Sequence, residues 1–207
     1  MSDTVRPVTV LYTMPRSVYL GMEGVDCWDE ARDARKWPGG TPVVVHPPCR
    51  LWGGLRHLSN APHAERMLAW HAVQMVDLYG GVLEHPAGST LWRNQGLPIP
   101  LHGEPLSYTF GIDQVWFGFR ARKPSWLWIR GVPNDQLPEV PFRFGRGSHV
   151  ICTSKKIPDQ KVLKGDARQE TVSELADWLV AVARLVPPGF RGEGYAHRPL
   201  WPSLANL

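Results

Sequence analysis

Cysteine is scarce in this sequence: the 207 residues include three cysteines, at positions 27, 49 and 152, and none of them are in CxxC spacing. We therefore expect neither a disulfide framework nor a structural zinc site, and we expect the thiols to be reduced. Long hydrophobic runs are also missing, because no stretch reaches the roughly 18 apolar residues that a membrane-spanning helix needs. The N-terminus has no basic segment followed by an apolar one, so a secretory signal is not expected. These absences favour a cytoplasmic protein without a membrane partner.

The overall composition is that of an ordinary globular protein, with 43% hydrophobic and 20% charged residues. A chain of this length is expected to form one domain with a substantial core. The net charge of +4 is compatible with a polyanionic partner but does not require one. Basic residues gather in the second half, at Arg120, Arg122, Lys123, Arg130, Arg143, Arg146, Lys155, Lys156, Lys161 and Lys164. They are interpreted either as solvated loop charges or as an edge that follows phosphate groups.

The hydrophobic pattern of the first half predicts a strand–helix–strand unit. Residues 8–12 and 42–45 are apolar and rich in β-branched side chains, which is typical of strands. Residues 60–79 have a helical apolar face, and two glycines separate them from a further strand that begins at residue 82. This order predicts a right-handed crossover between parallel strands.

The second half adds two predicted strands and one helix. The strands are expected at 112–117 and 125–129, joined by a basic turn, and the helix at 171–185 begins with the capping-box pattern Thr-Val-Ser-Glu. Residues 26–37 alternate in charge and are expected to form a short exposed helix or a loop.

Together these elements predict an α/β fold with a Rossmann-like, mainly parallel sheet, flanking helices and a reduced N-terminal half. Residues 1–186 are predicted to form a single catalytic domain that includes a small basic insert at 130–165. Residues 187–207 are predicted to form a C-terminal tail.

Two short motifs that follow predicted strands are the sharpest chemical signals in the chain. His-Pro-Pro-Cys ends at Cys49, and Leu-Glu-His-Pro places Glu84 35 residues later. Active sites in α/β sheets gather at the carboxyl ends of strands, so we expect the thiol and the carboxylate to converge on one pocket. The rigid prolines and the neighbouring Arg50 are expected to lower the pKa of Cys49 toward the thiolate. The alternatives are a buried structural cysteine and a glutamate in a salt bridge.

These motifs resemble the catalytic Pro-Cys and Glu-Asn-Val/Pro motifs of DNA cytosine-5 methyltransferases, and the Ala-Gly-Ser and Leu-Trp that follow Glu84 are similar to small phage-encoded members. The segments 114–118 and 121–128 resemble the Gln-containing, Arg-bearing strand pair of that family. The resemblance covers roughly residues 40 to 130. The helix at 171–185 is similar to the final helix of the family, which closes the cofactor site. The resemblance implies a protein of a bacterial host or a phage-infected cell that acts on DNA.

The resemblance also implies roles for the motif residues. Cys49 would be the nucleophile that adds to carbon 6 of a pyrimidine, and Pro48 would shape its loop. Glu84 would hydrogen-bond or protonate ring nitrogen 3. This role favours a raised carboxyl pKa, which a pocket near Trp52 and Trp92 would supply.

Further residues are implied in substrate binding. Arg122 would contact the base oxygen or the sugar–phosphate, with Arg120 and Lys123 as competing candidates because the alignment is ambiguous there. Gln114 and Arg50 complete the implied substrate-binding set.

The methyl donor implied by the resemblance is S-adenosylmethionine. However, strand 8–12 is not followed by the glycine-rich turn that holds this cofactor in the family. Asp26 or Asp29 would contact its ribose, with solvated charge as the alternative for both. The segment from residue 129 to 165 is short compared with the recognition inserts of the family, so we expect low sequence specificity or a nucleotide substrate.

The same residues are also compatible with other functions. A zinc ion held by His46, Cys49 and His85 is a weaker alternative, and no metal is expected. The same cysteine and glutamate chemistry could modify a free nucleotide with another donor. A non-catalytic member of the family that binds DNA or a host protein is the remaining alternative.

Overall fold

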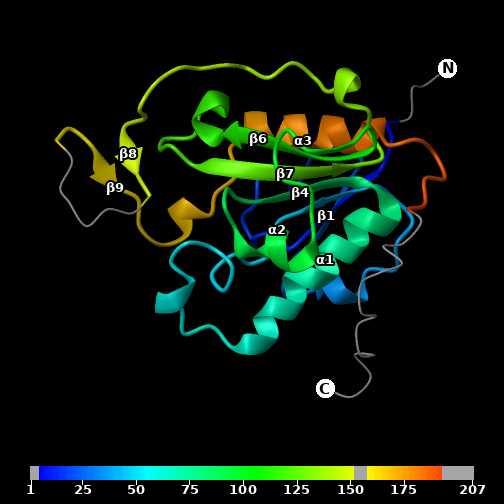
Figure 1. The fold of residues 1–207 in the computed structure, drawn as a ribbon, viewed down its shortest axis with the longest axis horizontal. Helices are drawn as coiled ribbons and strands as arrows, with labels where there is room; N and C mark the ends of the chain where they lie inside the picture. The colour runs from blue at the N-terminus through cyan, green and yellow to red at the C-terminus, as the bar shows by residue number, and fades with distance from the viewer. Residues whose placement is uncertain (1–4, 152–157, 193–207) are drawn as a thin grey trace.

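A seven-stranded mixed sheet forms the centre of the computed structural model, which describes residues 5–151 and 158–192 (Figure 1). Its strands are β1 (Val8–Leu11), β2 (Val25–Trp28), β3 (Val43–Val45), β4 (Gly81–Pro86), β5 (Gly103–Glu104), β6 (Ser107–Asp113) and β7 (Pro124–Arg130), in the order β2-β1-β3-β4-β7-β6-β5. Its helices are α1 (Arg66–Tyr79), α2 (Thr90–Gln95) and α3 (Ser173–Leu185). The predicted α/β class is confirmed.

One half of the sheet is parallel. Strand β1 pairs with β2 and β3, and β3 pairs with β4, all in parallel register. Strands β1 and β3 consist of Val, Thr and Leu, and every residue in them is buried, as expected for parallel strands that are covered on both faces. Helix α1 connects β3 to β4 and so forms the predicted parallel crossover.

The other half of the sheet is antiparallel, which corrects the prediction of a mainly parallel sheet. Strand β7 runs antiparallel to β4 and β6, and β5 runs antiparallel to β6. The connection between β6 and β7 consists of a short 3-10 helix (Gln114–Phe117) and a turn. Because this connection contains no crossover helix, the two strands pair as a hairpin.

Helices cover both faces of the sheet, with α3 on one side and α1 and α2 on the other (Figure 1). The alternation of side chains along the strands produces two core clusters. Val10, Val44 and Val82 pack in the cluster that contains the apolar residues of α3. Leu11 and Leu83 pack with the apolar residues of α1 and with Trp52 and Trp92.

Several local predictions differ from the structure. Segment 26–37 contributes strand β2 and a short 3-10 helix (Ala34–Lys36) instead of an exposed helix or loop alone. Helix α1 begins six residues later than predicted, after a 3-10 turn at His63–Glu65. Strand β6 covers Ser107–Asp113 instead of 112–117. The capping box does not form, because Val172 is the N-cap of α3 and no side chain caps it.

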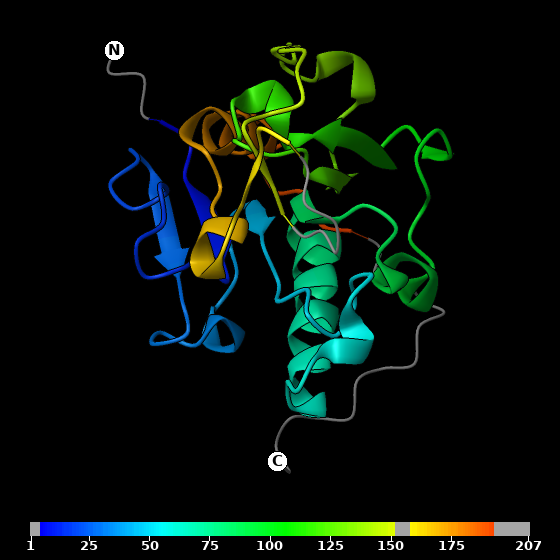
Figure 2. The same cartoon turned by 90° about the vertical axis from the view of Figure 1, so that its left-hand side faces the viewer.

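The basic segment after β7 contains a small separate sheet of two parallel strands, β8 (His149–Val150) and β9 (Lys161–Val162). Figure 2 shows it from the side. Cys152, Lys155, Lys156 and most of the predicted tail lie outside the described residues. Within the described ranges, no helix combines the length and the apolar character needed to cross a membrane.

Candidate functional site

The carboxyl ends of β3 and β4 bring the two motifs together. Val45 of β3 pairs with Leu83 of β4, so the next residues, His46 and Glu84, lie side by side. His46 Nδ1 is 3.2 Å from Glu84 Oε2. Cys49 follows in the loop after β3, where its carbonyl accepts hydrogen bonds from the two backbone amides of a tight turn. Both motifs therefore follow adjacent parallel strands at the same end of the sheet, as predicted, and a common pocket for the thiol and the carboxylate stays a prediction.

Glu84 is 9% exposed, and its carboxylate is surrounded by the hydrogen-bonding side chains of His46, Gln114 and Ser125, which we call the carboxylate cage. Gln114 Nε2 donates to Glu84 Oε1 at 2.9 Å and to the hydroxyl of Ser125 at the same distance. On the other side of the carboxylate, His46 uses its second nitrogen to contact the Tyr19 hydroxyl at 2.9 Å. Gln114 belongs to the predicted substrate-binding set, and the structure gives it direct contact with Glu84.

This cage decides the ionisation of Glu84. Burial is the largest single influence and raises the pKa, but the hydrogen bond from His46, the charge of Lys123 and the hydroxyl of Ser125 outweigh it. The pKa of Glu84 therefore lies well below its ordinary value, whereas the sequence predicted a raised one. Because the carboxylate has no proton, His46 Nδ1–H is the donor to Glu84, and its Nε2 faces the hydroxyl of Tyr19.

The face of the sheet explains why the expected tryptophan pocket around Glu84 is absent. Val82 packs in the α3 cluster, and Glu84, two residues later on the strand, points to the same side. His85 points to the opposite side, where its ring centroid lies 6.2 Å from that of Trp92. Trp52 belongs to that same α1 cluster. The prediction that Trp52 and Trp92 surround Glu84 is therefore wrong.

Cys49 is half-buried and is not part of a disulfide. Burial raises the pKa of its thiol, and the negative charge of Glu84 raises it further, while Lys123 lowers it to a smaller extent. The expected low pKa is thus wrong, and the thiol is neutral at pH 7. The carboxylate of Glu84 and the thiol of Cys49 therefore influence each other through their charges. Pro48 precedes Cys49 in the loop, as the motif requires.

Three of the basic residues predicted to bind substrate differ in their charged partners. Lys123 provides the positive charge that acts on both Glu84 and Cys49. Arg122 Nε is bound to Asp113 at 2.8 Å, although most of the Arg122 side chain is exposed. Arg120 forms an ion pair with Glu170 at 2.9 Å.

Arg50 lies beside the thiol in sequence but its guanidinium is directed to a different partner. It forms a bidentate ion pair with the buried carboxylate of Glu65, in which Nε lies 2.8 Å from Oε1 and 2.9 Å from Oε2. This pair fixes the start of the α1 segment to the loop that contains Cys49.

The two aspartates predicted to contact a ribose have protein partners. Asp26, in β2, accepts hydrogen bonds from Arg32 at 2.6 Å and from the Trp28 indole at 2.7 Å. Asp29 accepts from the backbone amide of Arg32. A better place for a cofactor is the edge between β1 and β3, where the strand order reverses. The hydroxyl oxygen of Thr13, which follows β1, is buried there without a hydrogen-bond partner.

The geometry does not favour the zinc site considered for His46, Cys49 and His85. His46 faces Glu84, whereas His85 points to the opposite face of the sheet, so the two cannot share an ion with Cys49. Among residues 5–151 and 158–192, no cluster of three or more His, Cys, Asp or Glu has the geometry of a metal site.

Sequence reasoning missed the roles of Tyr19, Ser125 and His46 in positioning the carboxylate. The His-Pro-Pro-Cys motif contains His46, and its place directly after a strand beside the glutamate motif was a usable signal. Tyr19 and Ser125 reach the site from a turn after β1 and from β7, and neither has a motif in the sequence that indicates this contact.

Searches of protein-family models, of curated proteins and of solved structures each found no match for this chain.

Proposed function

We propose that this protein modifies a pyrimidine base by transient addition of Cys49 to carbon 6 of the ring, with Glu84 as the group that binds and protonates ring nitrogen 3. The strongest support is that Cys49 and Glu84 follow adjacent parallel strands, and that the charge of Glu84 acts on the pKa of the Cys49 thiol. A structural glutamate could satisfy its charge with one arginine. The three-sided cage of His46, Gln114 and Ser125 instead orients this carboxylate.

The ionisation states favour a sequence of proton transfers. Before substrate binds, Cys49 is a neutral thiol and Glu84 is a carboxylate. The thiol proton passes to Glu84 as the sulfur forms its bond to carbon 6. The electron pair of the 5,6 double bond then shifts to form a 4,5 double bond, the former 3,4 pair moves to nitrogen 3, and this nitrogen takes the proton from Glu84. Carbon 5 thereby becomes an enamine carbon that attacks an electrophile.

We propose that the electrophile is the methyl group of S-adenosylmethionine and that the substrate is DNA. When bound, this cofactor would supply the activated methyl group. The edge between β1 and β3, with the unpartnered Thr13 hydroxyl, would hold it. The parallel half of the sheet is the part of the fold that we compare to a Rossmann-like arrangement.

One observation favours a second candidate. The connection between β1 and β2 consists of turns without a helix, and it contains no glycine-rich loop for a nucleotide-type cofactor. A nucleotide-level enzyme that uses the same two residues with another one-carbon donor would need less of the N-terminal half.

The test is covalent trapping on an oligonucleotide that contains 5-fluorocytosine, in the presence of S-adenosylmethionine, with denaturing gels as the readout. We expect a protein–DNA adduct that Cys49→Ala and Glu84→Gln abolish and that Cys27→Ala preserves. The absence of an adduct with folded wild-type protein on DNA would contradict the proposal. The same assay with a 5-fluoropyrimidine nucleotide, read by intact mass, separates the second candidate. Salt-sensitive DNA binding that is unchanged in Cys49→Ala, without any adduct, would instead identify a binding protein.

A further inference from the structure

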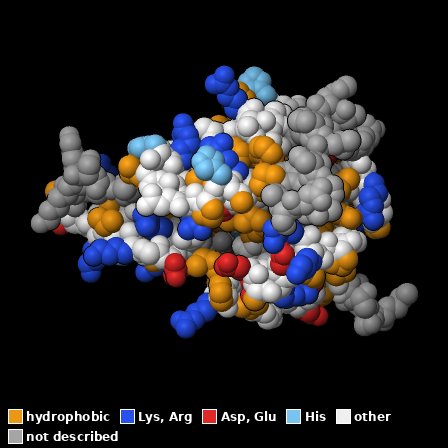
Figure 3. Space-filling view, turned by 90° about the horizontal axis from the view of Figure 1, so that it is seen from below, with side chains coloured by type: hydrophobic (Ala, Val, Ile, Leu, Met, Phe, Trp, Pro, Cys, Tyr) orange, Lys and Arg blue, Asp and Glu red, His pale blue; other side chains and the backbone are white. Residues whose placement is uncertain are grey.

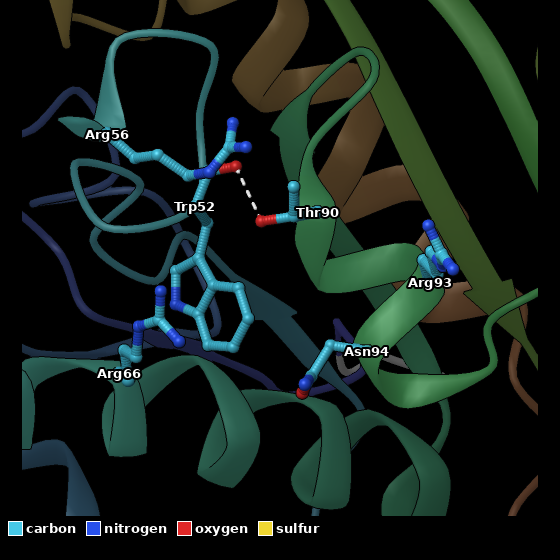
Figure 4. Close-up of a pocket in the computed structure, with 6 residues that line it drawn as sticks. All are labelled: Trp52, Arg56, Arg66, Thr90, Arg93 and Asn94. Carbon is cyan, nitrogen blue, oxygen red and sulfur yellow. Dashed lines mark hydrogen bonds between the residues drawn. The ribbon is translucent and has the colours of Figure 1, made fainter.

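A pocket of about 370 Å³ lies on the α1 and α2 side of the molecule, away from the carboxylate cage (Figure 4). Its lining combines one tryptophan, three arginines and two polar residues: Trp52, Arg56, Arg66, Thr90, Arg93 and Asn94. Figure 4 shows that these side chains come from the loop after Cys49, from the start of α1 and from α2. We call this set the arginine pocket.

The arginines of this pocket differ from the other site arginines because they have no acidic partner. Among the residues that the structure describes, no carboxylate lies within 4.0 Å of Arg56, Arg66 or Arg93. The nearest acidic neighbour in sequence, Glu65, is fully engaged by Arg50. Three positive charges around one cavity repel each other, and an anion in the cavity would remove that repulsion.

Two buried nitrogen donors in the pocket also lack partners. Trp52 is 1% exposed, and its indole nitrogen has no hydrogen-bond acceptor. The Nε of Arg66 is likewise buried and unpartnered, while the guanidinium carbon of Arg66 lies 5.0 Å from the centroid of the Trp52 ring. Trp52 and Arg66 both line the pocket, and buried donors in proteins are nearly always satisfied, so the two unpaired nitrogens favour a ligand with acceptor atoms there.

The pocket is joined to both motif loops. The carbonyl of Trp52, three residues after Cys49, accepts hydrogen bonds from the amide and the hydroxyl of Thr90 at 3.0 and 3.1 Å. Thr90 begins α2, which follows the strand that contains Glu84. A group bound in the pocket would therefore be held at a fixed position relative to the cysteine and the carboxylate. The face of the molecule seen from below presents basic and hydrophobic side chains, with several acidic ones among them (Figure 3).

We propose that the arginine pocket binds a phosphate group in the backbone of a single DNA strand. The ligand must supply negative charge and several acceptor oxygens, which a phosphodiester does. The cavity volume exceeds that of one phosphate and is in the range of pockets that hold small organic ligands, about 300 Å³ and above, so part of the adjoining sugar fits as well. The choice of DNA as the source rests on the proposed function.

The test uses fluorescence anisotropy of a fluorescein-labelled single-stranded 12-mer at several salt concentrations. The double variant Arg56→Ala/Arg93→Ala removes two exposed arginines without touching Trp52 or the site residues. The matched control is Arg191→Ala, because Arg191 is exposed and packs on Tyr79, at the opposite end of α1 from Arg66. Urea unfolding verifies that both variants are folded.

We expect the double variant to bind roughly tenfold more weakly at about 0.1 M salt, and the slope of log K against log salt to decrease in magnitude by about 0.7, as for one lost phosphate contact on a single strand. The Arg191 control should match wild type in both quantities. Equal affinity and equal slope for the double variant and the control would overturn the proposal.

Two further arms identify the source of the phosphate. Direct binding of inorganic phosphate or dCMP, measured by calorimetry, that the double variant loses while its oligonucleotide binding is unaffected would show a nucleotide or free-phosphate site and would overturn the strand proposal. An oligonucleotide with neutral methylphosphonate linkages should lose the difference between variant and wild type. The adduct assay with Cys49 is independent: arginine-dependent binding without an adduct would refute the base chemistry alone, and an adduct with arginine-independent binding would refute the pocket alone.

Discussion

Replacing Glu84 by glutamine is expected to lower the free energy of unfolding by about 2 kcal/mol at pH 7, since hydrogen bonds to a charged group contribute roughly 1.5–3 kcal/mol each and neutral ones about 1 kcal/mol. Glu84 accepts two such bonds from side chains at 3.2 and 2.9 Å. The amide keeps both positions but loses the charge, and the relief of burying a neutral group offsets part of the loss.

The substitution also forces a change in His46. In wild type, His46 Nδ1–H donates to the carboxylate, and Nε2 lies 2.9 Å from the hydroxyl oxygen of Tyr19. The glutamine oxygen remains the acceptor for Gln114, so its NH₂ group faces His46 Nδ1. Two donors cannot share this contact, and His46 must therefore move its proton to Nε2. Nitrogen chemical shifts of His46 report this tautomer directly.

The pH dependence gives the sign of the effect. The folded pKa of Glu84 lies below the ordinary value of 4.5, so its stabilising contribution is complete above that pH and is lost as the pH falls. The gap between wild type and Glu84→Gln should therefore shrink by about 1 kcal/mol on going from pH 7 to about pH 3.5, because one pKa unit corresponds to about 1.4 kcal/mol.

Urea unfolding followed by tryptophan fluorescence measures both quantities. With a slope of about 2 kcal/mol per molar urea, the expected difference in midpoint at pH 7 is about 1 M. The control Glu104→Gln changes an exposed glutamate and should leave the midpoint unchanged. Equal midpoints for wild type and Glu84→Gln at pH 7, or a difference that grows in acid, would show that the ionised Glu84 carboxylate does not stabilise the fold.

Two further predictions concern the thiol and the backbone of the sheet. In wild type, alkylation of Cys49 by iodoacetamide, mapped by mass spectrometry, should be slow at pH 7. At pH 8 it should be several-fold faster in Glu84→Gln than in wild type, because the charge of Glu84 raises the pKa of the thiol. Equal rates in the two proteins would show that Glu84 does not influence the thiol. Gly81→Ala should destabilise the protein by about 3 kcal/mol or more, since its Cβ would lie 1.9 Å from the carbonyl oxygen of Val43 at positive φ, whereas Gly88→Ala has positive φ in open space and should cost only about 1–2 kcal/mol; equal midpoints in urea for these two variants would contradict the packing argument.

The local pattern of the sequence was sufficient for the elements that frame the site. The apolar runs of β1 and β3, the helical face of α1 and the apolar face of α3 are properties of short segments, so they could be read without knowledge of the fold. The order strand–helix–strand then required that the segments after β3 and β4 meet at one edge. That is why the proximity of Cys49 and Glu84 could be predicted.

The direction of β7 and the existence of β2 could not be read in the same way. The apolar residues of β7 are compatible with either direction, and its antiparallel pairing with β6 depends on the short connection between the two strands. Strand β2 has a mixed burial pattern and charged neighbours, so its sequence alone resembled an exposed segment. Pairing with β1 through the backbone made it a strand.

Chain order and hydrophobic period are local properties, so they specify which residues stand at the strand ends. The chemistry of those residues depends on the neighbours that the fold brings to them. The face to which Glu84 points follows from the residue at which β4 begins, and its ionisation follows from burial and from His46, Lys123 and Ser125, which the fold brings to β4 from other parts of the chain. A pKa is set by every charge and dipole around the group, and no pattern along the chain specifies those neighbours.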